Sequence, residues 1–500
     1  MDMGGGGVSG GWGTKVWRRP FLTMLQSVCL MVPLGGCLLT DKPEPGLDIP
    51  QAYDRGPKNP VAAEAAVPPL DWWRSFHSRE LTELVEEARA SNLDIAAAVA
   101  RVVQADAQSR VAGAALLPLI NANGEASRSQ ASKTTSLGNG QPFVDDSGFK
   151  VGNNLLASLS ASYEIDFWGK NRSAMRATEE LAVASRYDRE VVGLSTVVAT
   201  ANAYFQVLAT QDLLRVTREN LQSSTRVFNL IQQRLNAGTA SALDTAQQEA
   251  LVNQVRALIP PLERTLVQNR NTLALLIARP PERVKVFGGS LRSIHYPRVT
   301  PGLPSELLTQ RPDIREAEAK LAAANANVEN ARAQMLPSIK LTGEGGYQSA
   351  VLKMLFRPES VFFNAAAGLT QPIFDGGALQ GNLDLQKGRQ DELLQNYRKA
   401  VISGFVDVET ALDGIRQTAL REQLQRNVVT SSQRAFDISE QRLREGTVDL
   451  VTVLQTQQTL YTAQLAQVQA QLEHVQAIVS LYQALGGGWL PKPVEASNAR

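Results

Sequence analysis

Apolar and polar residues alternate regularly over residues 155–167. The odd-numbered positions are apolar, and the even-numbered positions from Ser158 to Asp166 are serine, glutamate or aspartate. A period of two predicts a β-strand with one apolar and one polar face. Residues 119–128 alternate less cleanly, and residues 132–150 are rich in turn formers. The sequence therefore predicts a strand pair joined by a long loop.

A second stretch repeats this alternation. One face would carry Ile339, Leu341, Gly343, Gly345 and Tyr347, and the residues between them are mostly polar. A shorter loop leads to residues 362–373, where the alternation is weaker. We predict one strand pair at about 117–167 and another at about 337–373, four strands in all. Four strands do not close a barrel and lipid does not tolerate an open sheet edge, so a membrane role requires several chains to share one barrel.

Very long helical tracts follow the predicted strands. Residues 172–237 contain one glycine and no proline, and residues 391–445 contain two glycines and no proline. At 1.5 Å per residue, these tracts predict rods of roughly 100 and 80 Å, which is typical of coiled coils. The chain then returns through residues 242–279 and 448–485. Pro260-Pro261 must interrupt the first return, and the second has no such break.

The two halves of the chain repeat one plan. Each long tract ends in the pattern Q-R-L-x-x-G-T, and the two patterns lie 208 residues apart, where each predicts a hairpin tip. Residues 92–120 match 311–339 at a shift of 219, and Phe167-Trp168-Gly169 matches Phe374-Asp375-Gly376 at a shift of 207. This change of shift predicts about 12 extra residues in the first strand-connecting loop. So long a period indicates a duplicated half-domain and not a solenoid.

The N-terminus has the features of an exported lipoprotein. Basic residues precede a short apolar stretch that ends in Leu34-Gly35-Gly36-Cys37. We predict a signal peptide over residues 1–36 and acyl chains on Cys37, because Cys29, the only other cysteine, would be removed. The proline-rich residues 37–70 predict an extended tether.

Beyond the tether we predict two repeats and a tail. The first repeat spans residues 71–290 and opens with one helix over about 78–115. The second spans 291–489, and residues 490–500 form the C-terminal tail. The predicted fold class is an α+β membrane protein: a long α-helical coiled-coil barrel that contributes four strands to a shared transmembrane β-barrel.

Composition and charge argue against most kinds of chemistry. The net charge is +1, from 50 basic and 49 acidic residues, which gives no electrostatic reason to expect nucleic acid. His77, His295 and His474 lie far apart in the sequence and lack metal-ligand spacing. The glycines at 486–488 follow a helix, so they predict a helix stop and not a nucleotide cradle. We predict no catalytic residue, metal or cofactor.

Several motifs, in this order and spacing, resemble the outer-membrane efflux protein (TolC-like) family, and within it the NodT-type lipoproteins of resistance-nodulation-division tripartite pumps. The motifs that carry the resemblance are the lipobox at Cys37, Leu303-Pro304-Ser305-Glu306-Leu307-Leu308, Arg311-Pro312-Asp313-Ile314-Arg315-Glu316-Ala317-Glu318, Phe374-Asp375-Gly376-Gly377, Asp407-Val408-Glu409-Thr410-Ala411-Leu412, the two tips, and Leu485-Gly486-Gly487-Gly488-Trp489. The resemblance implies a homotrimer in the outer membrane of a Gram-negative bacterium. It also implies a helical tube in the periplasm, a periplasmic adaptor protein and an inner-membrane transporter as partners.

The resemblance also implies two sets of site residues. The tips would contact the adaptor through Arg234, Leu235, Gly238, Thr239, Arg442, Leu443, Gly446 and Thr447. The periplasmic aperture would be lined by Asp244, Val451, Thr452 and Gln455. Family members carry acids where this chain has Thr452 and Gln455, so we expect closure here to rest on apolar packing at Val451 and on hydrogen bonds, with less preference for cations.

Two other functions compete with an efflux duct. One is the outer-membrane channel of a type I protein secretion system, and the other is a structural coiled-coil lipoprotein. The lipobox favours the pump, and strand pairs with one polar face favour a channel over a structural rod. The topology places the loop at 132–150 outside the cell, and the sequence does not reveal the cargo.

Overall fold

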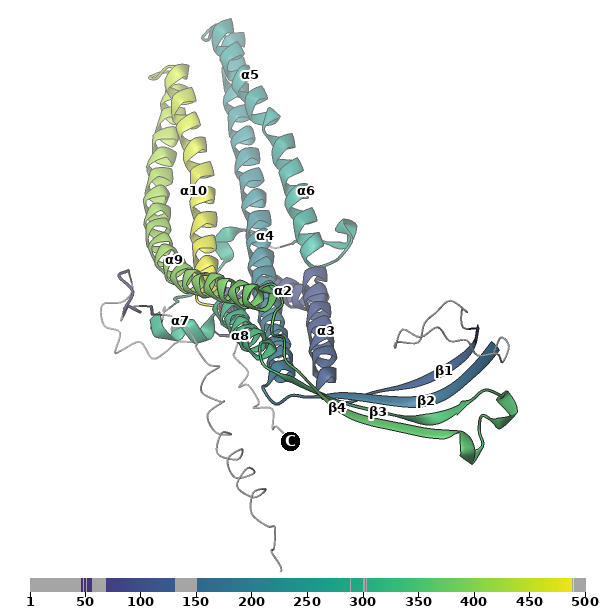
Figure 1. Ribbon diagram of the computed structural model, residues 1–500. Helices are drawn as coiled ribbons and strands as arrows, with labels where there is room; N and C mark the ends of the chain where they lie inside the picture. Colours follow the sequence, from purple (N-terminus) through teal and green to yellow (C-terminus); the bar gives the residue numbers. More distant parts are fainter. Residues whose placement is uncertain are drawn as a thin grey trace, which may run out of the picture.

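The computed structural model describes residues 46–47, 49–50, 52–55, 69–130, 151–287, 289–299, 302, 304–487 and 489. The predicted signal peptide, Cys37, most of the tether, residues 131–150 of the first loop and the tail at 490–500 lie outside the described residues. Two helical hairpins stand side by side. A sheet projects from the end of the molecule opposite the hairpin tips (Figure 1).

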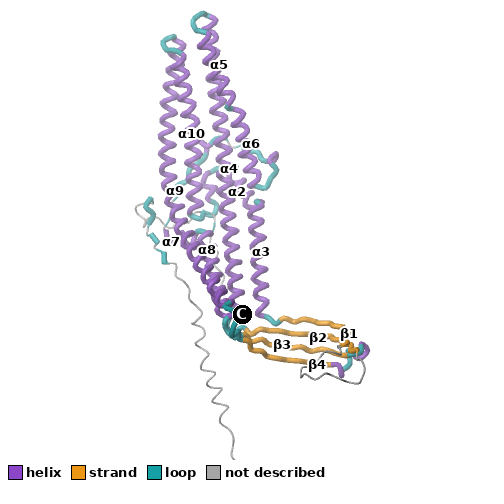
Figure 2. Tube along the Cα trace, turned by 45° about the horizontal axis from the view of Figure 1, so that its top comes forward, coloured by secondary structure: helices purple, strands orange, loops and turns teal. Residues whose placement is uncertain are grey.

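The sheet contains four antiparallel strands in the order β1-β2-β3-β4 (Figure 2). The strands are β1 (Leu119–Gln130), β2 (Val151–Ile165), β3 (Ser338–Ser349) and β4 (Val361–Thr370). The predicted number of strands is confirmed. Among the described residues of one chain, β1 and β4 each have one edge without a neighbouring strand.

The register aligns the apolar positions of all four strands on one face. Leu159 lies opposite Ala122 on one side and Gly345 on the other, and Gly345 lies opposite Phe363. The intervening residues form a polar face, where Ser160 lies between Asn121 and Glu344. The two-faced sheet predicted from the alternation is therefore confirmed.

The rods are α4 (Lys170–Asn236) and α9 (Ala378–Glu445), each about 100 Å long at 1.5 Å per residue. The prediction that the second rod begins at Asp391 was wrong by 13 residues. Gly381 and Gly388 lie inside α9, where an added Cβ would meet nothing within 4 Å. A glycine weakens a helix by only about 1 kcal/mol, so the helix continues through both.

The returning helices differ as predicted. The first return is divided at Leu258 into α5 (Ala242–Ala257) and α6 (Ile259–Leu276), because Pro260 and Pro261 lack the amide hydrogens that a continuous helix needs. The second return, α10 (Leu450–Ala484), is unbroken.

Shorter helices pack along the rods between their middle and the sheet. The single helix predicted over 78–115 was wrong, because Asn92 divides it into α2 (Arg79–Ser91) and α3 (Leu93–Gly113). Asn92 has extended backbone, and its side chain accepts hydrogen bonds from the amides of Asp94 and Ile95. The remaining elements are α7 (Pro304–Gln310), α8 (Pro312–Gln334) and the 3₁₀ turns Trp72–Phe76, Ala114–Leu116, Pro281–Arg283, Leu291–Ser293, Leu352–Met354 and Pro358–Ser360.

The structure corrects the alignment of the repeats. The strand registers place Ser162 and Thr370 at equivalent positions, 208 residues apart, and α4 and α9 begin after Gly169 and Gly377, also 208 apart. The returning helices end at Leu276 and Ala484 with the same spacing. Pairing Phe167 with Phe374 at 207 was therefore wrong by one residue, and the first loop has 11 extra residues instead of 12.

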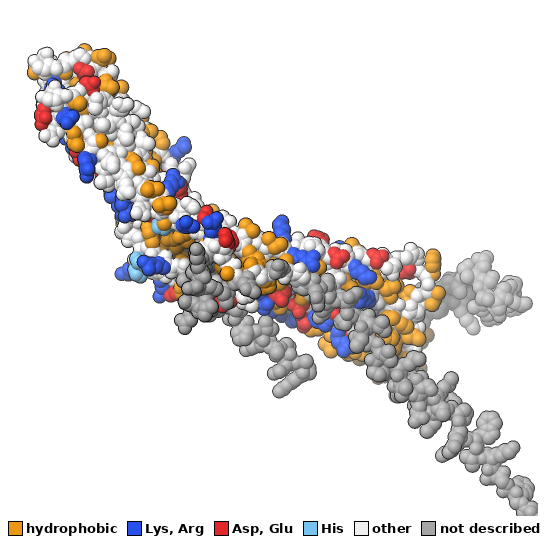
Figure 3. All heavy atoms as spheres, turned by 90° about the vertical axis from the view of Figure 1, so that its left-hand side faces the viewer, with side chains coloured by type: hydrophobic (Ala, Val, Ile, Leu, Met, Phe, Trp, Pro, Cys, Tyr) orange, Lys and Arg blue, Asp and Glu red, His pale blue; other side chains and the backbone are white. Residues whose placement is uncertain are grey.

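The main hydrophobic core lies where α2, α4 and α10 meet. Trp72, Phe76 and Phe205 are fully buried there, and Trp72 stacks on Tyr482 with ring centroids 4.8 Å apart. Burial of each such side chain contributes roughly 1.5–3 kcal/mol. Figure 3 shows acidic and basic side chains interspersed along one face of the helices.

Candidate functional site

Both tips close in the same way, which explains the pattern Q-R-L-x-x-G-T. Gly238 and Gly446 have φ values of 73° and 72°, the left-handed backbone that glycine adopts without strain. The amides of Thr239 and Thr447 donate to the carbonyl oxygens of Arg234 and Arg442 at 2.8 and 2.9 Å. The two threonine hydroxyls donate to the same oxygens. Each motif therefore satisfies carbonyl groups at the end of a rod.

A hydrogen bond joins the two tips within one chain. Arg234 Nη1 donates to the carbonyl oxygen of Leu443 at 2.7 Å, near the C-terminal end of α9. A guanidinium is favourable there, because the last carbonyls of a helix carry partial negative charge. Of the predicted adaptor-contacting residues, Arg234 and Leu235 are half-buried and Leu443 is buried. The others, Gly238, Thr239, Arg442, Gly446 and Thr447, are exposed.

The predicted aperture residues on α10 share one face of the helix. Val451 is 57% exposed, and Gln455 is exposed one turn further along. Thr452 is half-buried, and its amide donates to the Asp449 carboxylate at 2.8 Å as part of the helix cap. The exposed face at the start of α10 therefore carries Val451 and Gln455, both uncharged.

Asp244, the acidic residue predicted for the aperture, belongs to a helix cap. Its carboxylate accepts hydrogen bonds from the amide and hydroxyl of Ser241, both at 2.9 Å. The Ser241 hydroxyl accepts from the Asp244 amide in return, which makes a reciprocal capping box. This pairing occupies one carboxylate oxygen of Asp244.

The sequence reasoning missed the equivalents of Val451 and Gln455 in the first repeat. At the shift of 208 these are Leu243, which is 66% exposed, and Gln247, which is also exposed. The signal was present, because the tip motif had already fixed this shift. The matching residues are an apolar side chain and a glutamine in both repeats.

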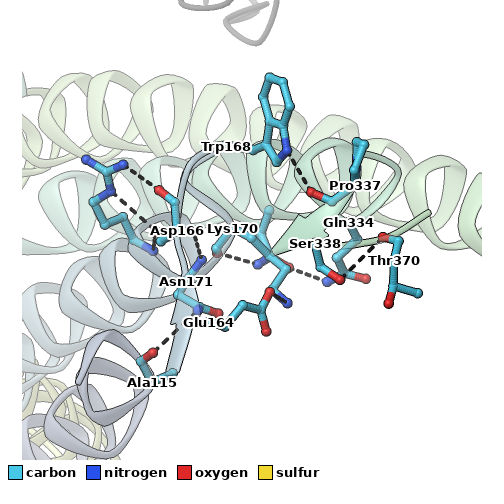
Figure 4. Close-up of polar contacts among 12 residues, drawn as sticks. Ala115, Glu164, Asp166, Trp168, Lys170, Asn171, Gln334, Pro337, Ser338 and Thr370 are labelled. Carbon is cyan, nitrogen blue, oxygen red and sulfur yellow. Dashed lines mark hydrogen bonds and ion pairs between the residues drawn. The ribbon is translucent and has the colours of Figure 1, made fainter. Parts of the chain in front are cut away.

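A polar network fixes the sheet to the rods (Figure 4). Trp168 Nε1 donates to the carbonyl oxygen of Pro337 at 2.8 Å, and Lys170 forms an ion pair with Glu164. The Asp166 carboxylate accepts from the amides of Asn171 and Arg172 at the start of α4. Strand β2 is thereby joined rigidly to the rod that follows it.

The motif Arg311-Pro312-Asp313 organises the middle of the molecule. The Arg311 guanidinium donates to Asp313, lies 3.0 Å from a carboxylate oxygen of Asp407 on α9, and donates to the carbonyl oxygen of Ala484 at the end of α10. Gly404 leaves room for this packing, because an added Cβ would stand 3.2 Å from Leu307. These motif residues are structural.

The spacing of the three histidines in the sequence suggested that they are isolated from one another, but two of them are in contact. The rings of His77 and His295 stack with centroids 4.5 Å apart, and His474 Nδ1 lies 2.7 Å from Glu422. Among the described residues, no group of three or more His, Cys, Asp or Glu side chains is placed to hold a metal ion.

A family model described as "Outer membrane efflux protein" matches residues 84–279 and 303–487. The chain belongs to the outer membrane efflux protein family. It is 40% identical to the "Pyoverdine export outer membrane protein OpmQ" of Pseudomonas aeruginosa, over 93% of this chain and 96% of that one. It is 31% identical to the "Probable efflux pump outer membrane protein TtgC" of Pseudomonas putida, over 93% and 95%.

Solved structures of the same family have the same fold. The outer-membrane channel CmeC of Campylobacter jejuni matches with a TM-score of 0.82 at 25% identity, over 90% of this chain and 95% of that one. The MtrE outer-membrane channel of Neisseria gonorrhoeae, in its open state, matches with a TM-score of 0.77 at 28% identity, over 90% and 97%.

Family membership confirms the predicted class of function, location and partners. The protein is an outer-membrane efflux channel of a Gram-negative bacterium. Members of the family are trimeric components of tripartite systems and work with a periplasmic adaptor and an inner-membrane transporter. The names of the relatives given above refer to export or efflux, and neither refers to protein secretion or to a structural role.

Proposed function

We propose that this chain is one third of a passive exit duct that performs no chemistry itself. The observation that carries this proposal is the two-faced sheet with its two unpaired edges. Three copies joined edge to edge would close a barrel with the apolar face toward lipid and the polar face toward water. The alternative of a structural rod has no use for such a sheet.

The polar face of the sheet would line the part of the duct that crosses the outer membrane. Ser158 donates to Glu344 at 2.7 Å, and Glu164, which lies directly opposite Lys340, forms an ion pair with Lys170. Polar groups that bond to one another keep a wetted wall ordered without binding the cargo tightly.

The aperture would lie at the start of α5 and α10. Three Leu243 and three Val451 side chains would form an apolar ring, with Gln247 and Gln455 in the next layer. Such a constriction closes by excluding water, because its two layers are uncharged. The Asp244 carboxylate keeps its negative charge while it accepts the two hydrogen bonds of the Ser241 cap, so it is the nearest charged group to this constriction.

The adaptor would bind the exposed tip residues and the groove beneath them. This groove between α4 and α9 measures about 590 Å³ and is lined in part by Arg226, Glu440 and Arg444. Glu440 pairs with both arginines, at 3.4 and 2.7 Å, so the groove presents fixed charges of both signs. Cys37 would carry acyl chains that anchor the tether to the outer membrane.

The cargo would be a molecule of the pyoverdine type. The relatives named for pyoverdine export are 38% and 40% identical to this chain, whereas those named for antibiotic, toluene or cation efflux are 30–31% identical.

Deletion of the gene tests this proposal. The pyoverdine-type molecule should accumulate in the periplasm and become less abundant in the medium, and the wild-type gene should restore export. Normal export from the deletion strain would reject the cargo. The duct itself is tested by planar-bilayer conductance of the purified protein, and a trimer without any conductance would reject the duct.

A further inference from the structure

The long rods α4 and α9 present equivalent apolar positions that differ in burial. Val198 on α4 is 7% exposed, but its equivalent on α9, Val406, is 56% exposed. Val216 is 5% exposed, and its equivalent Leu424 is 55% exposed. In α4 this face is covered partly by α10 of the same chain, where the hydroxyl groups of Thr217 and Tyr461 lie 3.2 Å apart. Within the described part of one chain, α9 has an apolar face of the same kind that lacks this cover.

The missing cover is present in the chain but faces away from α9. Helices α5 and α6 of the first repeat are equivalent to α10 of the second. Val475 of α10 is fully buried, whereas its equivalent on α6, Val267, is exposed. Within one chain, α4 packs on α10. The equivalent faces, on α9 and on α5 and α6, are both uncovered, so they can pack on each other in the same way.

The tips show the same asymmetry. Arg234 is bonded to the Leu443 carbonyl, whereas the side chain of Arg442, its equivalent, makes no hydrogen bond or ion pair with any described residue. The carbonyl oxygen of Leu235, the equivalent of Leu443, accepts from the Gly238 amide at 2.9 Å. A carbonyl oxygen has two lone pairs, so the Leu235 oxygen can still accept a second hydrogen bond.

We propose that Arg442 of each copy donates to the carbonyl of Leu235 in the neighbouring copy, with the exposed face of α9 packed on α5 and α6 of that copy. Each contact between the two repeats of one chain is then repeated between chains. Three bonds within chains and three between chains would alternate around the aperture and hold it closed. This inference rests on the proposed trimeric duct.

The equivalence of the two repeats also fixes the register between β4 of one copy and β1 of the next. Applying the shifts of 208 and 219 to the β2–β3 pairing places Leu369 of β4 opposite Gly124 of the neighbouring β1, and Ala367 opposite Ala126. Both pairs join apolar positions to apolar positions, as a continuous lipid-facing surface requires. A slip of one residue would reverse the faces of every strand.

Cysteine cross-linking tests the helix contact. Ser224 Oγ accepts from Gln457 Nε2 at 2.9 Å within one chain, so the equivalent pair between chains is Ser432 and Glu249. A chain with Ser432→Cys and Glu249→Cys should form covalent trimers with a short bis-maleimide, and the parent chain should not. The pair Ala367→Cys and Ala126→Cys tests the barrel. If only the barrel pair cross-links, the helix contact and its clamp are rejected and the shared barrel stands; if neither does, the trimeric duct fails too.

Conductance in planar bilayers tests the clamp. Arg442→Ala should raise the conductance of the resting channel severalfold, as Arg234→Ala should, and Arg442→Lys should retain most of the closure because lysine still donates. Arg434→Ala is the matched control, since Arg434 is an exposed arginine of α9 away from the tip. If Arg442→Ala forms trimers yet conducts like Arg434→Ala, the clamp is rejected. If Arg442→Ala forms no trimers, Arg442→Lys decides. A conductance of Arg442→Lys equal to that of the wild type supports the clamp, and one as high as that of Arg234→Ala rejects hydrogen-bond donation by residue 442.

Discussion

Ala278 and Gly486 occupy equivalent positions, and both have left-handed backbone, with φ values of 52° and 71°. Each ends its helix with the same pattern. The backbone amide of Arg279 donates to the Ala274 carbonyl at 3.0 Å, and the backbone amide of Gly487 donates to the Tyr482 carbonyl at 2.8 Å. The first repeat thus holds a side chain in a conformation that costs an L-residue roughly 1–2 kcal/mol.

Ala278→Gly should therefore stabilise the protein by up to about 1 kcal/mol, less the entropy that glycine adds to the unfolded chain. Gly486→Ala should destabilise it, because the new Cβ would stand 2.5 Å from the Gln310 carbonyl oxygen. The temperature at which the trimer dissociates on a gel measures both effects. A lower temperature for Ala278→Gly would contradict this account of strain.

Gly346→Ala should impair assembly of the barrel. Gly346 lies opposite Ser158, and an added Cβ would stand 2.6 Å from the Ser158 Cα and closer still to the Ala157 carbonyl. Strand β2 would have to move away, which breaks the β2–β3 ladder. The yield of heat-resistant trimer in outer-membrane fractions reports the effect. Gly343→Ala is the control, since its Cβ would find its nearest neighbour at 4.0 Å.

Val451→Ser together with Gln455→Ser should open the aperture, and Leu243→Ser together with Gln247→Ser should do the same. Serine removes the apolar surface that excludes water from the constriction. Gln455→Asp should raise the preference for cations, because it adds three carboxylates around the axis. Single-channel conductance and reversal potentials measure these changes. Unchanged values in all three variants would place the constriction elsewhere.

The tip of the second hairpin should loosen in acid. Hydrogen bonds from the Thr452 side chain and then its amide hold the pKa of Asp449 below its ordinary value of 3.8. The carboxylate therefore stabilises the cap above that value, and its contribution is lost as the pH falls through the lowered pKa. The protection of the amides at residues 450–453 against hydrogen exchange, measured relative to the rate of an unstructured peptide at the same pH, should fall below pH 3.8. In Asp449→Asn, which keeps a capping side chain, this loss of protection should disappear; its persistence would assign it to another group.

Cys37→Ser should give an exported protein that a fatty-acid probe no longer labels. Loss of the thiol removes the only remaining site for a thioether in the exported chain. The trimer should still fractionate with the outer membrane, because its barrel spans the bilayer. Labelling equal to that of the wild type would contradict the anchor.

The strands and rods were predictable because their signals are local and periodic. The polar face around Ser160 follows from alternation in sequence, and the length of α4 follows from the absence of proline. The start of α9 was not predictable by this reasoning, because Gly381 and Gly388 suggest a break while the Asp375 carboxylate caps the helix through the amides of Gly377 and Leu379. Weak propensity gave way to a strong cap.

The candidate site was predicted only in part. The tip motif identified both hairpin ends, and Val451 and Gln455 followed by counting from Gly446. Leu243 and Gln247 needed the shift of 208 to be applied throughout, and the bond from Arg234 to Leu443 depends on how two hairpins stand side by side. A contact between residues 209 positions apart leaves no periodic trace in the sequence.

The break at Leu258 gives the two hairpins different mechanics. Helix α10 is unbroken, so a force applied at its tip is transmitted to the middle of the molecule. The first hairpin has a joint between α5 and α6, where the prolines remove hydrogen bonds that would resist bending. An adaptor that pulls equally on all the tips would flex one hairpin of each chain and tilt the other as a rigid arm, so the aperture would widen with threefold rather than sixfold symmetry.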